Sequence, residues 1–126
     1  MKPLKRQTMS ASATLHVLER PQLYGHRIQY SDAIHLLIID ETAIPCTPTE
    51  YSLLQTLLQH AGEGVPINDL LGRPAKQVVK LHTRRTLTQY ISRLRARLWP
   101  FGLEILCLNG YGYLLLPRSY EQATGT

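Results

Sequence analysis

The periodicity of the sequence changes at Thr47, and this change strongly limits the folds that the chain can adopt. Upstream of Thr47, short apolar runs alternate with polar residues and turn signals, as β-strands do. Thr47-Pro48-Thr49-Glu50 is then a capping-box pattern, with proline at the first helical position, where its missing N–H has little consequence. Beyond this pattern, apolar residues recur at helical spacing. The sequence therefore predicts an α+β fold.

The segment before Thr47 predicts an antiparallel meander. We expect its strands at residues 15–18, 27–30, 34–39 and 43–46. Asp40-Glu41-Thr42 supplies a tight polar turn between the last two strands. Nothing in this segment has the residue pattern of a catalytic site.

Three helices are predicted after Thr47. The first is ended by Gly62 and Gly64, a second and shorter helix is expected over residues 66–72, and a loop follows over residues 73–82. The third helix is expected to begin near Thr83 and to end near Leu98. The buried stripe of the first helix is predicted to contain Tyr51, Leu54, Leu57, Leu58 and Ala61.

A β-hairpin follows the third predicted helix. Residues 103–108 and 111–116 are apolar runs of strand length, and Asn109-Gly110 between them is a strong hairpin signal. A helix followed directly by a β-hairpin is the order of elements in a winged helix.

The third predicted helix has two distinct faces when its residues are placed at about 100° intervals. Its apolar stripe is expected to contain Leu87, Tyr90, Ile91, Leu94 and Leu98. The opposite face and its flanks hold Arg85, Thr86, Thr88, Gln89, Ser92, Arg93, Arg95, Ala96 and Arg97. Arg, Gln, Ser and Thr side chains hydrogen-bond base edges and phosphates in a major groove. This face is therefore a candidate DNA-recognition surface, and a solvated basic face is the alternative.

Positive charge is concentrated around this helix. The whole chain has a net charge of +5, yet no acidic residue lies between Asp69 and Glu104. That stretch contains Arg73, Lys76, Lys80, Arg84, Arg85, Arg93, Arg95 and Arg97. The excess of positive charge is thus local, which indicates a surface that faces a polyanion.

Several other classes of protein are disfavoured by the sequence. Cys46 and Cys107 are far apart in apolar surroundings, so we expect both to be reduced and buried, in a cytoplasmic protein. The five histidines lack the close spacing of a metal site, and we expect no metal and no cofactor. No apolar run is long enough to cross a bilayer, so no membrane partner is expected. A phosphate-binding glycine loop, paired carboxylates and an activated nucleophile are all lacking, and we expect no enzymatic activity.

Over residues 28–116 the chain resembles the OmpR/PhoB-type DNA-binding domain, the effector half of many two-component response regulators. Thr47-Pro48-Thr49-Glu50-Tyr51 is similar to that family's T-P-T-E-F helix start. Arg85-Thr86-Leu87 with Ile91-Ser92-Arg93-Leu94-Arg95 resembles its recognition helix, R-T-V…I-S-R-L-R. Asn109-Gly110-Tyr111-Gly112-Tyr113 is similar to its R-G-V-G-Y wing. The resemblance implies a winged helix-turn-helix, with an N-terminal four-stranded antiparallel sheet, three helices and a C-terminal hairpin wing.

The resemblance also implies a set of DNA contacts, with the third helix in the major groove and the wing on the nearby backbone or minor groove. Arg85, Thr86, Arg93 and Arg95 match family positions that contact phosphates or bases, and Tyr113 matches the wing tyrosine near the backbone. The expected DNA-binding residues are Arg84, Arg85, Thr86, Thr88, Gln89, Ser92, Arg93, Arg95, Asn109 and Tyr113.

Four departures from the family pattern modify these expectations. Asn109 replaces the wing arginine, Thr88 and Tyr90 stand where an acid and a histidine are common, and Pro66 replaces a helix-capping serine. The base preference should therefore differ from that of relatives. No receiver domain precedes the meander in this sequence, so we expect either a stand-alone regulator, which Met1 favours, or a fragment of a longer one.

Together these features predict a sequence-specific transcriptional regulator that binds double-stranded DNA. We expect one domain over residues 14–117, flexible tails at 1–13 and 118–126, and a cytoplasmic, nucleoid-associated location. RNA polymerase is a candidate partner, and two copies are expected to bind tandem half-sites as a homodimer. The alternative is a winged helix that acts as a protein-interaction module, with its basic face against RNA polymerase or another regulator.

Overall fold

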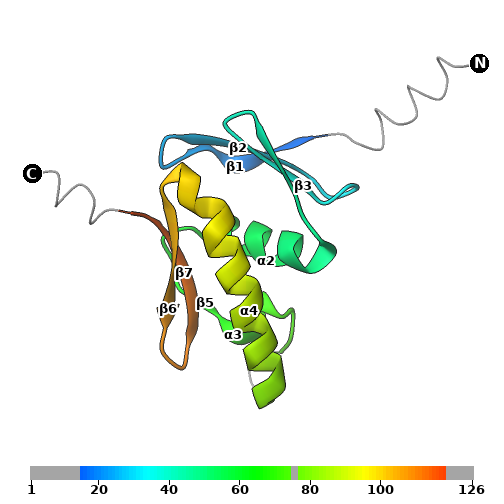
Figure 1. The fold of residues 1–126 in the computed structure, drawn as a ribbon, viewed down its shortest axis with the longest axis vertical. Coiled ribbons are helices and arrows are strands. Elements are labelled where there is room, and N and C mark those ends of the chain that lie inside the picture. The colour runs from blue at the N-terminus through cyan, green and yellow to red at the C-terminus, as the bar shows by residue number, and fades with distance from the viewer. Residues whose placement is uncertain (1–14, 75–76, 119–126) are drawn as a thin grey trace, which may run out of the picture. The chain divides into compact units, whose positions relative to one another are not determined.

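The computed structural model describes residues 15–74 and 77–118, which form two compact units that meet in sequence between Tyr51 and Ser52 (Figure 1). Both units contain an antiparallel sheet, and helices follow the first sheet. The predicted α+β class and the predicted order of elements are thus confirmed. The boundary between the units lies within helix α2 (Pro48–Gln59).

The first unit contains the predicted meander. Its strands, in both sequence and sheet order, are β1 (His16–Leu23), β2 (His26–Ser31), β3 (Leu36–Ile39) and β4 (Thr42–Pro45). β1 is longer than expected. β3 begins at Leu36 rather than at residue 34, because His35 adopts a φ of 51°, which is incompatible with an extended strand. Ile28, Leu37, Ile39 and Ile44 are buried and form the apolar core of this unit.

The turn between β3 and β4 consists of Asp40 and Glu41, both with positive φ (50° and 72°). Such a two-residue turn matches the strand twist but favours Gly or Asn. Asp40 is held there by its side chain, which accepts hydrogen bonds from the backbone N–H of Arg27 (2.9 Å) and from Nδ1 of His26 (2.5 Å). Both hydrogen bonds lower the pKa of Asp40, and the one from His26 has the larger effect.

Helix α2 begins with the predicted capping box. The backbone N–H of Glu50 donates to Oγ1 of Thr47 (3.2 Å), and the N–H of Thr47 donates to Oε1 of Glu50 (3.1 Å). All five residues of the predicted stripe are buried. Tyr51 additionally donates its hydroxyl proton to Oδ1 of Asp32 (2.6 Å), and burial together with this bond raises the pKa of Tyr51.

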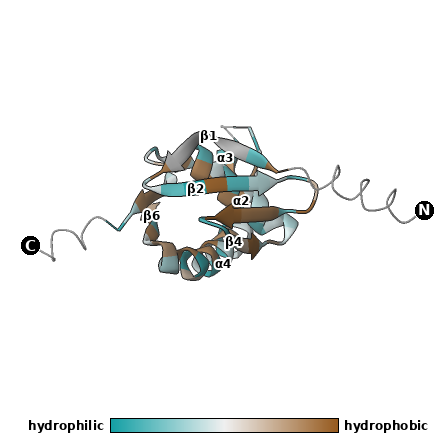
Figure 2. Cartoon of the chain, turned by 90° about the horizontal axis from the view of Figure 1, so that it is seen from above, coloured by the Kyte–Doolittle hydropathy of each residue, from teal (hydrophilic) through white to brown (hydrophobic). Residues whose placement is uncertain are grey.

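The second unit combines helices with a three-stranded sheet of order β5-β7-β6. Its elements after α2 are β5 (Val65–Pro66), α3 (Ile67–Leu70), α4 (Leu81–Leu98), a 3-10 turn (Trp99–Phe101), β6 (Leu103–Leu108) and β7 (Gly112–Pro117). Helix α4 lies beside the β6–β7 hairpin (Figure 1). Hydrophilic and hydrophobic residues alternate around α4, as expected for an amphipathic helix (Figure 2).

Three boundaries in this unit differ from the sequence prediction. The second helix has only four residues, because Pro66 is extended (φ −63°, ψ 152°) and pairs with Gly112 as part of β5. Helix α4 begins at Leu81, two residues earlier than expected. Tyr111 belongs to the hairpin turn, since its N–H donates to the carbonyl oxygen of Leu108 (2.8 Å), and β7 begins one residue later.

Candidate nucleic-acid interface

Helix α4 is fixed in the second unit by its apolar stripe. Leu87, Ile91, Leu94 and Leu98 are buried, and Tyr90 is half-buried. The opposite face is open to solvent. The exposed residues of this face, which we call the α4 polar face, are Arg84, Arg85, Thr86, Thr88, Gln89, Ser92, Arg93 and Ala96. The structure thus brings most of the predicted site residues together on one surface.

Two threonines on the α4 polar face direct their hydroxyl protons into the helix. Oγ1 of Thr86 donates to the carbonyl oxygen of His82 (3.0 Å), and Oγ1 of Thr88 donates to that of Arg84 (2.9 Å). With its proton engaged, each hydroxyl can accept a hydrogen bond but not donate one. Both side chains therefore offer an acceptor and a methyl group, which suit a base amino group and a thymine methyl group respectively.

The amino-terminal part of α4 is strongly cationic. No acidic residue lies in its first turn, and Arg84 and Arg85 are exposed just beyond its start. A helix N-terminus already carries partial positive charge, so arginines there disfavour the isolated helix and favour a bound anion. The positive charge at this end of α4 therefore favours a bound phosphate, although it destabilises the helix itself.

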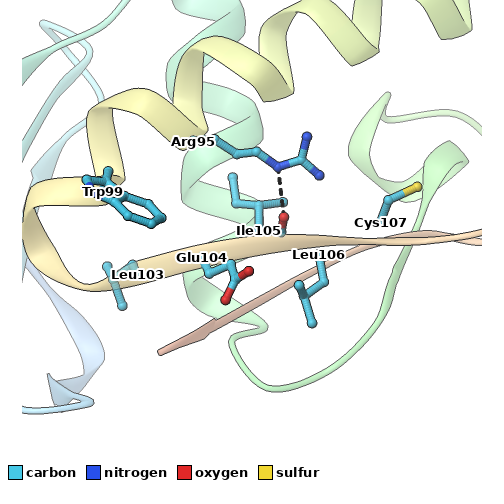
Figure 3. A pocket seen from close by; sticks show the side chains of 7 residues that line it. All are labelled: Arg95, Trp99, Leu103, Glu104, Ile105, Leu106 and Cys107. Atoms are coloured by element: carbon cyan, nitrogen blue, oxygen red, sulfur yellow. Dashed lines mark hydrogen bonds between the residues drawn. The ribbon is translucent and has the colours of Figure 1, made fainter. Parts of the chain in front are cut away.

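Arg93 and Arg95 are more constrained than the other arginines. The guanidinium carbon of Arg93 lies 5.4 Å from the centre of the Tyr90 ring, a cation–π distance. Arg95 is half-buried, and its Nε donates to the carbonyl oxygen of Ile105 (2.9 Å), which links α4 to β6 (Figure 3). Its two terminal amino groups point away from Trp99 (Figure 3).

The hairpin tip is the second part of the candidate interface. Asn109 is exposed there, and Tyr111 beside it is 51% exposed. Tyr113, in contrast, is only 7% exposed and lines a cavity of about 110 Å³ with residues of α4 such as Leu87 and Thr88. The structure therefore places Tyr111, which the sequence analysis did not single out, where an exposed wing aromatic was expected. Its position directly after the Asn109-Gly110 turn signal could have identified it.

The cysteines differ from expectation in one respect. Cys46 is only half-buried and Cys107 on β6 is exposed, so the prediction that both are buried is wrong. Cys107 lies on the same face of β6 as the buried Leu103 and Ile105, but nearer the hairpin tip, where this face is exposed. Across residues 15–74 and 77–118, no helix has the length and apolar composition needed to cross a membrane.

An exposed polar helix followed by a β-hairpin defines a winged helix-turn-helix DNA-binding domain. Residues 41–115 match the family described as "Transcriptional regulatory protein, C terminal". The chain belongs to this family, and it is a DNA-binding transcription-regulator domain of the OmpR/PhoB type. None of the curated protein sequences compared with the chain matches it.

The solved structures of two DNA-binding domains, those of AdeR and CadC, show the same fold. The DNA-binding domain of the response regulator AdeR, in complex with an intercistronic region, is 21% identical, with a TM-score of 0.54 over 70% of this chain and 90% of that one. The DNA-binding domain of E. coli CadC is 21% identical, with a TM-score of 0.51 over 83% and 92%. The C-terminal domain of the nisin resistance regulator NsrR is 30% identical, with a TM-score of 0.48 over 64% and 82%.

Proposed function

We propose that the protein is a sequence-specific transcriptional regulator that inserts α4 into the major groove of double-stranded DNA. The observation that carries this proposal is the α4 polar face, where Arg, Gln, Ser and Thr are exposed and acidic residues are lacking. Those side chains hydrogen-bond phosphates and base edges. A helix face that is exposed to solvent without a binding role usually carries both positive and negative side chains.

The proposed contacts divide by chemistry. Arg84, Arg85, Arg93 and Arg95 neutralise phosphates, because arginine binds phosphate oxygens strongly and carries a permanent charge. The proposed base-reading residues are Thr86, Thr88, Gln89 and Ser92.

The wing contributes neutral contacts. Asn109 and Tyr111 contact the adjacent backbone or minor groove, while the buried ring of Tyr113 supports the hairpin from inside. Asn109 is uncharged, so we propose that this wing adds shape recognition and hydrogen bonds rather than charge insertion into the minor groove.

Two partners are proposed beyond DNA. A second copy bound head to tail on a tandem half-site would double the recognised sequence. RNA polymerase is the proposed partner of the segment that leads into α4, where Val78 is 83% exposed and Leu81, the first residue of the helix, is 64% exposed. Exposed apolar side chains of this size favour a protein contact. Loss of activated transcription in Val78→Ser, with DNA affinity unchanged, is the expected result, and wild-type activation in this variant would refute the contact.

The salt dependence of DNA affinity tests the proposed function. If about five to seven phosphates are neutralised, the logarithm of the association constant falls with the logarithm of salt concentration with a slope of roughly −5 to −6. Fluorescence anisotropy with a labelled mixed-sequence duplex measures this slope. Arg27→Ala is a matched control, because Arg27 is exposed on β2, outside the α4 polar face, and its removal should leave the slope unchanged. A slope near zero would contradict the proposal.

A further inference from the structure

The base of the hairpin is joined to the C-terminal end of α4 by Arg118. The guanidinium of Arg118 stacks on the ring of Trp99, with its carbon 3.7 Å from the ring centre. Nη2 of Arg118 also donates to the carbonyl oxygen of Trp99 (2.8 Å), and its backbone N–H donates to that of Gly102 (2.9 Å). A residue assigned by the sequence to a C-terminal tail therefore makes three interactions with the turn between α4 and β6.

These interactions fix the β6–β7 hairpin at its base, the end opposite to the tip. Each strand of the hairpin has six residues, which extend about 20 Å from the base to the tip. A tilt of about 10° at the base therefore moves the tip by about 3 Å. Nearer the tip, β5 holds β7 through the Val65–Tyr113 pair, and Arg95 holds β6 at Ile105. Arg118 supplies the attachment at the base.

We propose that Arg118 is a positioning residue for DNA binding, which acts through Trp99 to set the angle between the wing and α4. The inference rests on the proposed function, in which α4 and the hairpin tip contact DNA together. Trp99 follows Arg85 by fourteen residues, about 21 Å along the helix axis, so Arg118 lies far from the cationic start of α4. Its effect on DNA is thus indirect.

The charge distribution separates positioning from phosphate binding. Residues 108–113 at the tip contain no charged side chain, so a misplaced wing loses only neutral contacts. Replacing Arg118 should weaken DNA binding about 3- to 10-fold, because a preorganised surface is lost. The salt slope should stay close to that of the wild type, whereas loss of a direct phosphate contact would reduce it by about 0.9.

Trp99 reports on this arrangement directly, because it is the only tryptophan in the chain. Arg118→Ala, Arg118→Gln and Arg118→Lys are compared with the wild type by tryptophan emission and by anisotropy titration against a duplex of about 30 base pairs, which accommodates two half-sites. All three variants should change the emission and lower the affinity. Lysine keeps the charge but loses the planar stack and its fixed hydrogen bond, so it should not restore affinity.

A double-mutant cycle with Trp99→Leu tests the coupling. If Arg118 acts through Trp99, the double variant should bind no more weakly than the weaker single variant. Thermal unfolding identifies a temperature at which the variants are folded. Arg118→Gln, which keeps a long polar side chain without the charge, replaces Arg118→Ala if the alanine variant does not fold.

The contrary outcomes are distinct. An Arg118 variant with changed tryptophan emission but wild-type DNA affinity would overturn the proposal. Losses of affinity that are additive in the double-mutant cycle would also overturn it. A smaller salt slope that lysine restores would make Arg118 a phosphate contact instead. Failure of the wild type to bind any duplex in the same titration would contradict the proposed function itself, and the inference with it.

Discussion

Nε of Arg95 lies 2.9 Å from the carbonyl oxygen of Ile105, so a side chain of α4 is hydrogen-bonded to the backbone of β6. β6 is an edge strand, and edge strands expose backbone groups to other chains unless something covers them. Arg95 covers one such group and at the same time fixes α4 against the hairpin. One residue therefore contributes to both the fold and the candidate interface.

Arg95→Ala should weaken binding to every duplex about ten-fold and reduce the free energy of unfolding by about 1 kcal/mol, because a phosphate contact and a partly buried hydrogen bond are both lost. Anisotropy titrations on two unrelated duplexes and thermal unfolding measure the two effects. Arg95→Lys should recover most of the affinity through its charge but not the stability. Unchanged affinity in Arg95→Ala would exclude the proposed phosphate contact.

Gln89→Ala should reduce discrimination between a selected duplex and a scrambled one by about ten-fold, because a bidentate base contact is worth about 1–3 kcal/mol. Its affinity for the scrambled duplex should change little. Arg93→Ala is the matched comparison on the same face and should weaken binding to both duplexes alike. Equal losses from both substitutions would show that Gln89 does not read bases.

Gly112→Ala should destabilise the second unit by at least about 3 kcal/mol or prevent its folding. A Cβ atom at position 112 would lie 1.8 Å from the carbonyl oxygen of Val65, so β5 could not pair with β7. Gly110→Ala is the control in the same hairpin. No atom lies within 4 Å of a Cβ there, and only the φ of 74° opposes alanine, at a cost of about 1 kcal/mol. Similar melting temperatures for both variants would contradict this packing.

The first sheet should lose stability in acid through Asp40. The hydrogen bonds from His26 and from the N–H of Arg27 hold the pKa of Asp40 below its ordinary value of 3.8 in the folded state. This stabilisation is complete above the ordinary pKa and is lost as the pH falls through the lowered folded pKa. Denaturant unfolding should therefore show the wild type losing more stability than Asp40→Asn as the pH falls from neutral through the folded pKa of Asp40. A stability difference between the two proteins that does not change with pH would refute this role.

The success of the sequence predictions followed the strength of the local patterns. The capping box at Thr47 and the apolar stripe of α4 depend on fixed spacings within one helix, and both were predicted, although Tyr90 of the stripe is only half-buried. Strand β5 was missed, because two residues cannot show a period and only pairing with β7 makes Val65 and Pro66 a strand. Long-range pairing of this kind leaves no local signal.

The candidate site shows the same division. Helical periodicity identified the exposed residues of α4, including Gln89 and Arg93. The burial of Tyr113 and the stacking of Arg118 on Trp99 depend on contacts between elements that are distant in sequence. Family similarity therefore located the wing in the sequence, but it did not predict which of the two wing tyrosines faces solvent.

The central claim is that α4 reads a DNA sequence, and selection from a randomised duplex library at near-physiological salt tests it most directly. We predict enrichment of one motif over successive rounds, in two copies about one helical turn apart if the protein binds in tandem. The motif should weaken when Gln89→Ala is selected in parallel. Retention of duplexes without enrichment, or no retention at all, would contradict sequence-specific recognition by this helix.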